Sequence, residues 1–210
     1  MPKTLILFDF DGTIADTKSI AFKAYQVIAK HYGIEMESEA QMNALNQLSI
    51  KDRLKAYNVP LYKVPTLIKK SSEIMHETIQ EAQIFEGMEA LLRTLKAIGH
   101  IIAIVSSNRK SIIEAFLNSH QLDIFDALIG KAPMFKKEKS IKKMMKHFHA
   151  KKHETIYIGD EVRDIEASKR LGIDVLGVAW GYDAQSLLKA SAPNNLFDTV
   201  DDLTKYLLTL

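Results

Sequence analysis

Cysteine is absent from this sequence of 210 residues. Its absence excludes disulfide bonds and every metal site built from thiolate ligands, and it is compatible with a reducing compartment. Long hydrophobic runs are absent too, because no apolar stretch approaches the ~18 residues that a membrane-spanning helix needs. The first apolar run, Leu5–Phe8, stops at Asp9 and is therefore unlike a secretory signal. We expect a cytoplasmic protein with no membrane partner.

A large excess of charge of one sign is also missing. The formal net charge is +2, with 26% charged and 47% hydrophobic residues, as in ordinary globular proteins. One stretch departs from this balance: between Lys131 and Lys152, nine lysines stand against one acid, Glu138. Ile141 and Met144 have helical spacing and would face the core, which puts most of these lysines on a solvated helix face. No aromatic platform is interleaved with them, so we expect no nucleic-acid partner. The composition does not indicate an oligomeric state.

Short apolar segments alternate with amphipathic helical patterns through most of the chain. The segments are rich in isoleucine or valine, as strands buried on both faces should be. They are Thr4–Phe10, Ile101–Val105, Ala127–Ile129, Thr155–Ile158 and Val175–Ala179. This alternation predicts an α/β fold with a doubly wound, mostly parallel, Rossmann-like sheet and helices on both of its faces.

One long stretch, from about residue 16 to 83, breaks the alternation with helical patterns and no convincing strand. We predict that residues 1–15 and 84–210 form the α/β core domain and that residues 16–83 form a small α-helical cap domain. The cap would lie over the carboxyl edge of the sheet. Two cations in it, Lys51 and Arg53, are expected on a solvated helix face rather than against an anionic substrate.

A pair of acids follows the first predicted strand. Asp9 and Asp11 are two residues apart, so in extended backbone they point to the same side. Carboxylates this close repel each other, which implies a cation or a shared proton between them. Gly12 allows a sharp turn where they emerge. The pair is the first candidate for catalytic chemistry.

A second acidic cluster follows the predicted strand Thr155–Ile158. Asp160 and Asp164 are four residues apart and share one face if a helix begins there. Asp160 could merely cap that helix. Two acidic clusters at two strand ends favour a common explanation instead, and their oxygen ligands suit Mg²⁺.

Two further elements supply groups that bind anions. Ser106, Ser107 and Asn108 follow the strand Ile101–Val105, where hydroxyl and backbone N–H groups can hold a phosphate. Serine and asparagine are also ordinary loop residues. Phosphoryl transfer further needs a cation near the nucleophile, and a group of lysines precedes the fourth strand. Sequence position alone does not choose among its members, Lys136, Lys137 and Lys139.

Together these four elements, in this order, resemble the haloacid dehalogenase superfamily, in particular its aspartate-nucleophile phosphatases. The first and fourth motifs of that family match Asp9-x-Asp11-Gly12-Thr13 and Gly159-Asp160-x-x-x-Asp164. Ser106 falls where the second motif has serine or threonine. The helical insertion matches the C1-type cap, and Gly177-Val178-x-Trp180-Gly181 resembles the phosphoglycolate phosphatase branch.

The resemblance implies a division of labour among the acids. Asp9 would attack the phosphate ester, and Asp11 would act as the acid and then the base. Mg²⁺ would be held by the Asp9 carboxylate, the Asp11 backbone carbonyl and Asp160. Glu161 and Asp164 would orient water around the metal.

The resemblance also assigns the groups that bind the phosphoryl oxygens. They would be Ser106, Ser107 and Asn108 together with one lysine. Many relatives carry this lysine in a Lys-Pro pair, which this sequence lacks. By analogy with relatives that have Phe-Gly-Lys here, Phe135-Lys136-Lys137 makes Lys137 the preferred residue and Lys136 the runner-up.

The implied activity is that of a Mg²⁺-dependent phosphatase acting on a small phosphorylated metabolite through an aspartyl-phosphate. Phosphoglycolate is the substrate suggested by the branch; nucleotide monophosphates, sugar phosphates and pyrophosphate stay open. A sugar phosphomutase like β-phosphoglucomutase would share Asp9 and Asp11. A non-catalytic binding or regulatory protein on the same scaffold would be expected to have lost an aspartate, whereas Asp9, Asp11 and Asp160 are all present.

Overall fold

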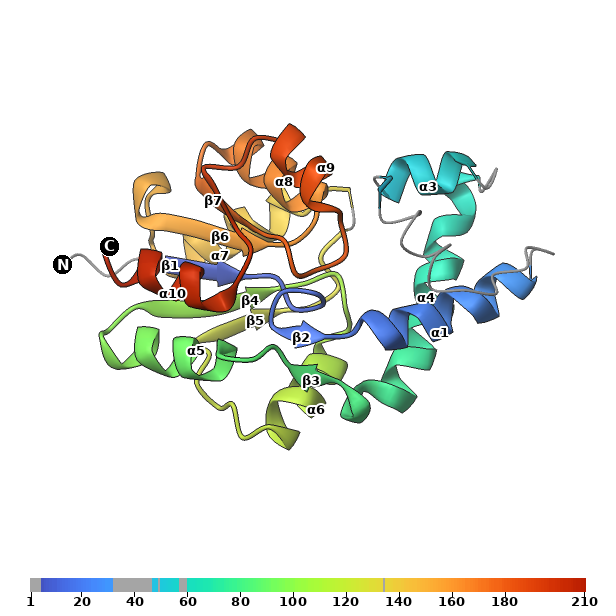
Figure 1. Cartoon of the computed structure of the whole chain (residues 1–210), viewed down its shortest axis with the longest axis horizontal. Helices are drawn as coiled ribbons and strands as arrows, with labels where there is room; N and C mark the ends of the chain where they lie inside the picture. The colour runs from blue at the N-terminus through green and yellow to red at the C-terminus, as the bar shows by residue number, and fades with distance from the viewer. Residues whose placement is uncertain (1–4, 32–46, 49, 57–59, 134) are drawn as a thin grey trace.

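The centre of the molecule is a six-stranded parallel sheet, seen in the computed structural model in Figure 1. The structure describes residues 5–31, 47–48, 50–56, 60–133 and 135–210. The strand order is β5-β4-β1-β6-β7-β8, and every neighbouring pair is parallel. The strands are β1 (Leu5–Phe8), β4 (Ile101–Val105), β5 (Ala127–Ile129), β6 (Thr155–Gly159), β7 (Asp174–Val178) and β8 (Asn195–Phe197).

The five predicted strands are confirmed to within two residues at each described end. Thr4, the expected start of the first strand, lies outside the described residues. The edge strand β8 was not predicted, because its three residues include an exposed asparagine and form no apolar run. A second, two-stranded sheet pairs β2 (Ala15–Asp16) with β3 (Gln83–Ile84). These two-residue strands are too short to give a sequence pattern, and they join the two ends of the helical insertion.

Helices cover both faces of the sheet, as the alternating strand β1 requires. Side chains along a strand point to opposite faces. Ile6 and Phe8 join the core cluster that includes residues of α5, α6 and α10, whereas Leu5 and Leu7 join the cluster with residues of α7 and α8. This arrangement confirms the doubly wound α/β fold. The helices are α5 (Met88–Ala97), α6 (Lys110–Ser119), α7 (Glu138–His147), α8 (Val162–Leu171), α9 (Gln185–Ala190) and α10 (Val200–Leu207).

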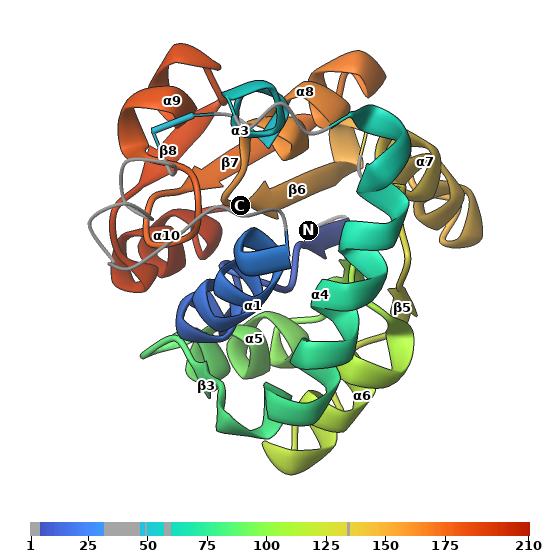
Figure 2. The same ribbon diagram turned by 90° about the vertical axis from the view of Figure 1, so that its right-hand side faces the viewer.

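The described residues between β2 and β3 are helical. They form α1 (Lys18–His31), α3 (Ile50–Ala56) and α4 (Val64–Thr78), with short 3₁₀ turns at Leu61–Lys63 and Ile79–Glu81. In Figure 1 these helices lie to the right, beyond the end of the sheet toward which β1 points. Figure 2 looks onto that end and shows α1 and α4 in front of the strands. The described residues between 16 and 83 thus stand where the predicted cap would be, and the domain boundaries themselves stay a prediction.

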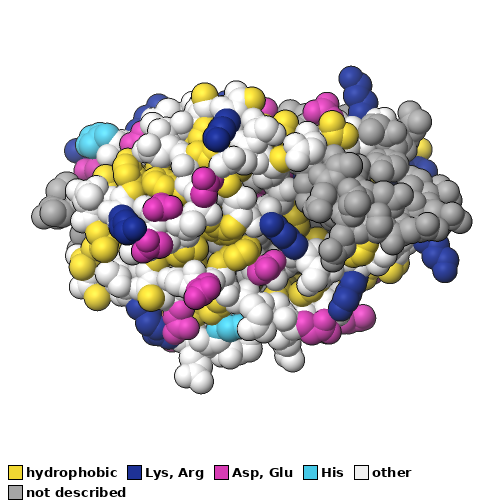
Figure 3. Space-filling view, in the orientation of Figure 1, with side chains coloured by type: hydrophobic (Ala, Val, Ile, Leu, Met, Phe, Trp, Pro, Cys, Tyr) yellow, Lys and Arg dark blue, Asp and Glu magenta, His cyan; other side chains and the backbone are white. Residues whose placement is uncertain are grey.

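The surface shows no segregation of charge on the face seen in Figure 3, where acidic and basic side chains are interspersed. On α7, Ile141 and Met144 are buried while Lys142, Lys143 and Lys146 are exposed, which confirms the expected solvated face. Among the helices that the structure describes, none combines the length and apolar character needed to cross a bilayer.

An aromatic contact fixes the loop after β1 to the core. Phe10, between the two candidate acids, is fully buried, and its ring meets the edge of Phe116 from α6 with centroids 5.1 Å apart at 82°. Three backbone N–H groups, of Thr13, Ile14 and Ala15, donate to the Phe10 carbonyl and close the turn. The positions of Asp9 and Asp11 therefore depend on core packing.

Removing the Phe116 ring should lower stability by creating a cavity under this loop. We expect Phe116→Ala to reduce the free energy of unfolding by about 3–5 kcal/mol in urea titrations. The control is Leu208→Ala, because Leu208 is 47% exposed and should change stability by less than about 0.5 kcal/mol. Equal losses for the two variants would contradict the packing described.

Candidate active site

Three neighbouring strands deliver the predicted site residues to one edge of the sheet. The loop after β1 carries Asp9 and Asp11, the loop after β4 carries Ser106–Asn108, and β6 leads into Asp160. These strands lie in the order β4-β1-β6, so their carboxyl ends are adjacent. Ligands of open parallel sheets bind at this edge.

A buried lysine binds two of the acids. The Lys137 ammonium donates to Asp9 Oδ2 at 2.7 Å and to Asp164 Oδ1 at 2.6 Å, and its side chain is only 1% exposed. Lys136 and Lys139 are exposed. The structure therefore brings Lys137 to Asp9, and not the other two lysines. The second oxygen of Asp9, Oδ1, accepts from the Phe10 backbone N–H at 2.8 Å, which fixes the orientation of the carboxylate.

Asp11 has a pKa matched to neutral pH. Burial, and secondly the charge of Asp9, raise the pKa of Asp11 from 3.8 to about 7, although hydrogen bonds from Asn108 and Thr17 oppose the rise. The Asn108 amide lies 3.2 and 3.1 Å from the two Asp11 oxygens. Asp11 can therefore hold and release a proton near pH 7. The Asn108 amide thus donates to Asp11, and its expected contact with substrate stays a prediction.

Three carboxylates form a site suited to a hard cation. Asp9, Asp160 and Asp164 are buried, and each offers an oxygen within 4.8 Å of the others. Burial, then the charge of Glu161, raises the pKa of Asp160. Burial also raises the pKa of Asp164 to about 7, even though Lys137 opposes the rise. Buried acids this close repel unless a cation lies among them, and Mg²⁺ prefers such oxygen ligands, so the residues fit the predicted metal.

This cluster differs in composition from the predicted ligand set. Asp9 and Asp160 belong to both. Asp164 was expected only to orient water, but its oxygen lies within the cluster. The contribution predicted for Asp11 was its backbone carbonyl, and its side chain is not in the cluster.

A loop that follows β7 holds Asp160 in place. The Tyr182 backbone N–H donates to Asp160 Oδ2 at 2.8 Å, and the Thr13 hydroxyl donates to Asp160 Oδ1 at 2.7 Å. A side chain at Gly181 would put its Cβ 2.1 Å from the Asp160 Cβ, so glycine is required there. Trp180 donates through its indole N–H to the Thr13 carbonyl at 3.2 Å. The tail residues noticed in the sequence therefore support the acidic site.

Arg163 is a site residue that the sequence reasoning missed. Its side chain is 14% exposed, donates to Glu161, and places both terminal nitrogens 3.4 Å from the Ser107 hydroxyl oxygen. Its charge lowers the pKa of Asp11 and of Asp164. The available signal was a cation inside the Asp160-x-x-x-Asp164 motif, but arginine at a helix start usually faces water.

The remaining predicted residues lie at the same edge with partners of their own. Glu161 pairs with Arg163, and its expected role in orienting water stays a prediction. The Ser106 side chain is 1% exposed, and its hydroxyl oxygen accepts from the Asn108 backbone N–H at 3.0 Å. Because Ser106 accepts in that bond, its own proton stays available to a phosphoryl oxygen.

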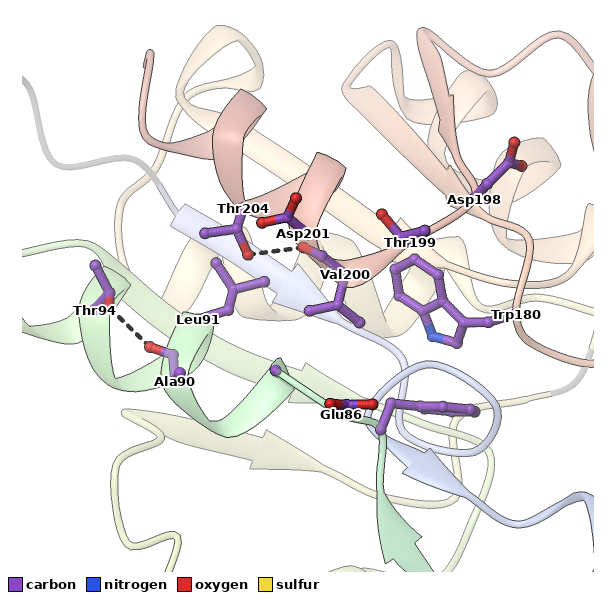
Figure 4. Close-up of a pocket in the computed structure, with 12 residues that line it drawn as sticks. Glu86, Ala90, Leu91, Thr94, Trp180, Asp198, Thr199, Val200, Asp201 and Thr204 are labelled. Carbon is purple, nitrogen blue, oxygen red and sulfur yellow. Dashed lines mark hydrogen bonds between the residues drawn. The ribbon is translucent and has the colours of Figure 1, made fainter.

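A separate cavity, of about 590 Å³, lies between α5 and the start of α10 (Figure 4). Its lining includes Leu91, Val200, Phe85 and Trp180, and the centroids of the last two rings are 6.1 Å apart. None of the predicted catalytic, metal or phosphate-binding residues lines it. This cavity is therefore distinct from the predicted site at the carboxyl edge of the sheet.

The raised pKa of Asp11 predicts a specific dependence of stability on pH. A folded-state pKa above the unfolded value favours folding at low pH, and this contribution is lost as pH rises from about 4 to 7. In the presence of a chelator, we expect the stability of Asp11→Asn relative to the wild type to rise by about 2–3 kcal/mol between pH 5 and pH 8. Thermal or urea unfolding at both pH values measures this. The same difference at both would contradict the assigned pKa.

Comparison with known proteins agrees with this geometry. The family model of haloacid dehalogenase-like hydrolases matches residues 6–178. The chain is 27% identical over 199 residues to phosphoglycolate phosphatase of Synechococcus elongatus and 24% identical over 203 residues to pyrophosphatase PpaX of Bacillus mycoides, with 94% of each chain covered in both cases.

Its fold is shared with a haloacid dehalogenase-like family hydrolase from Streptococcus pneumoniae, with a TM-score of 0.81, 21% identity and 98% of each chain covered. The matched family model spans most of the chain, including the strands and loops that carry the acidic site. The resemblance inferred from the motifs is confirmed: this protein is a hydrolase that belongs to the haloacid dehalogenase-like family.

Proposed function

We propose that this protein is a Mg²⁺-dependent phosphatase that hydrolyses a small phosphorylated metabolite through a phosphoryl group carried on Asp9. The observation that supports this most directly is the environment of Asp9. Its carboxylate is buried, is oriented by the Phe10 N–H and the Lys137 ammonium, and lies beside an acid with a pKa of about 7. A fixed carboxylate next to a proton carrier is what two-step phosphoryl transfer needs.

In the first step, an Asp9 oxygen attacks phosphorus while the bond from phosphorus to the leaving oxygen breaks. Asp11 donates its proton to that oxygen, so the leaving group of an ester departs as a neutral alcohol and that of an anhydride as a protonated phosphate. The pKa of about 7 keeps a large share of Asp11 protonated at neutral pH. The Asn108 amide holds the Asp11 carboxyl group at both oxygens.

In the second step, water attacks the phosphorus of the phosphoryl-aspartate, and the bond from phosphorus to Asp9 breaks. Asp11, now ionised, takes a proton from the attacking water and is ready for the next cycle. Inorganic phosphate is the second product. Asp11 therefore acts as acid and then as base without needing a second proton carrier.

Positive charge is needed to bring a carboxylate and a phosphate together. Asp9, Asp160 and either Asp164 or the Asp11 carbonyl would hold Mg²⁺, which when bound supplies charge neutralisation at the phosphoryl oxygens. The chain itself supplies Lys137 beside Asp9 and Arg163 beside Ser107. We propose that these two cations, with the Ser106 and Ser107 hydroxyls, hold the phosphoryl group.

The substrate class follows from the relatives and from the helical insertion. One relative is named for phosphoglycolate and another for pyrophosphate, so the proposed class is small phosphate esters and anhydrides. We propose that residues 16–83 form a cap that excludes water and contacts the leaving group. The phosphomutase alternative would rearrange a sugar phosphate without net release of phosphate, which the assay below distinguishes.

Two adjacent lysines offer a matched test. We expect wild-type protein to release phosphate from p-nitrophenyl phosphate only with Mg²⁺, and Lys137→Met to lower kcat/KM by roughly 100-fold or more because Asp9 and the phosphoryl group lose a cation. Lys136→Met should stay within about twofold, since Lys136 is exposed.

Circular dichroism of both variants checks that the fold is retained. Absence of phosphate release by the wild type from a broad panel of phosphate esters and anhydrides would contradict the proposed function. Equal activity of Lys136→Met and Lys137→Met would contradict the assignment of the lysine.

A further inference from the structure

A buried ion pair joins the helical insertion to the α/β core. The Arg53 Nη2 atom of α3 lies 2.6 Å from Asp183 Oδ1 in the loop after β7, and the two side chains are 6% and 3% exposed. Arg53 also donates through Nε to the Leu48 carbonyl at 2.7 Å. The expectation that Arg53 lies on a solvated helix face is therefore wrong. Its guanidinium is enclosed where α3 meets the loop after β7, and Arg53 as a whole is 5% exposed.

The same aspartate contacts the loop that carries the candidate metal site. Asp183 Oδ2 accepts from the Val162 backbone N–H at 2.8 Å, at the first residue of α8. The Asp183 N–H donates to the Asp160 carbonyl at 3.4 Å. One Asp183 oxygen thus pairs with Arg53 of the insertion. The other accepts from the first N–H of α8, the helix that follows Asp160 and Glu161.

The burial of this pair points to a positional role. Taking two charges out of water is costly, and buried pairs often add little net stability. They do fix geometry, because leaving one partner buried and unpaired is strongly unfavourable. By contrast, the Lys23–Glu81 pair between α1 and the turn after α4 is 55% and 60% exposed, so water screens it and it constrains little.

We propose that Arg53 and Asp183 form a latch that holds the helical insertion closed over the carboxyl edge of the sheet and couples that closed position to the start of α8. Both are positioning residues, since they act through α3 and through the loop of Asp160. The closed position of the insertion can be measured without any assay of catalysis. The consequence for turnover rests on the proposed function.

The absence of cysteine from the sequence makes a direct distance measurement practical. Lys69→Cys on α4 and Lys142→Cys on α7 are exposed sites for two nitroxide labels, one in the insertion and one in the core. Pulsed electron–electron double resonance then reports the separation in the full-length protein. We expect one narrow distribution for the otherwise wild-type protein and for Arg53→Lys. For Arg53→Met we expect a broader distribution that extends to longer distances.

The control is Lys23→Met, which removes an exposed ion pair of the insertion and should leave the distance distribution unchanged. If Arg53→Met does not fold because Asp183 is left unpaired, Arg53→Met/Asp183→Asn removes the buried charge while an amide oxygen still accepts from Val162. That double variant should fold and show the broad distribution. A distribution identical to the wild type in either folded variant would overturn the latch.

Kinetics separate the latch from a direct contact with substrate. With p-nitrophenyl phosphate, Arg53→Met should lower kcat/KM by roughly tenfold, and Arg53→Lys should restore most of it. A loss of activity with an unchanged distance distribution would overturn the latch in favour of substrate binding by Arg53. If the wild type hydrolyses no phosphate compound, the proposed function fails, whereas the distance measurement still decides the latch.

Discussion

The rest of the site depends on one interaction, the bond of the buried Lys137 ammonium to both Asp9 and Asp164. Asp9 follows β1 and Asp164 lies in the first turn of α8, and with Asp160 they form a buried cluster that is costly without compensating charge. Lys137 supplies part of that charge and fixes the carboxylate of Asp9. It leaves a concentrated negative site that a divalent cation and an anionic phosphoryl group can share. Burying these charges lowers the stability of the fold, and in return the Asp9 carboxylate is already oriented before a ligand binds.

The surrounding structure fixes the positions of these charged side chains. Phe10 is packed against Phe116, so the turn between Asp9 and Asp11 is anchored in the core. Behind Asp160, the loop after β7 approaches so closely that Gly181 admits no side chain. Through Asp183 the same loop reaches the helical insertion. Direct contacts therefore join the core, the acidic cluster and the insertion. Movement of the insertion can change the position of the acids through Asp183 and the loop after β7.

The fold and the acids were predictable because their signals are local. An apolar strand followed by Asp9-x-Asp11 can be recognised from neighbouring residues alone, and so can the buried strands of a parallel sheet. Lys137 needed the family resemblance, since periodicity does not distinguish it from Lys136. Arg53 and Arg163 were misjudged or missed for one physical reason: arginine on a short helix is usually solvated, and only the tertiary structure shows which surface becomes covered. The edge strand β8 lacked any hydrophobic pattern to identify it.

The central claim is that Asp9 carries the phosphoryl group. Acid quenching of the enzyme during turnover with a phosphate ester and Mg²⁺, followed by tryptic digestion and mass spectrometry, tests this directly. The account predicts one phosphoryl group on the peptide that contains Asp9, located at Asp9 by fragmentation and absent from Asp9→Asn. A phosphoryl group on Asp11, or turnover with none on this peptide under conditions where the intermediate would accumulate, would contradict the account.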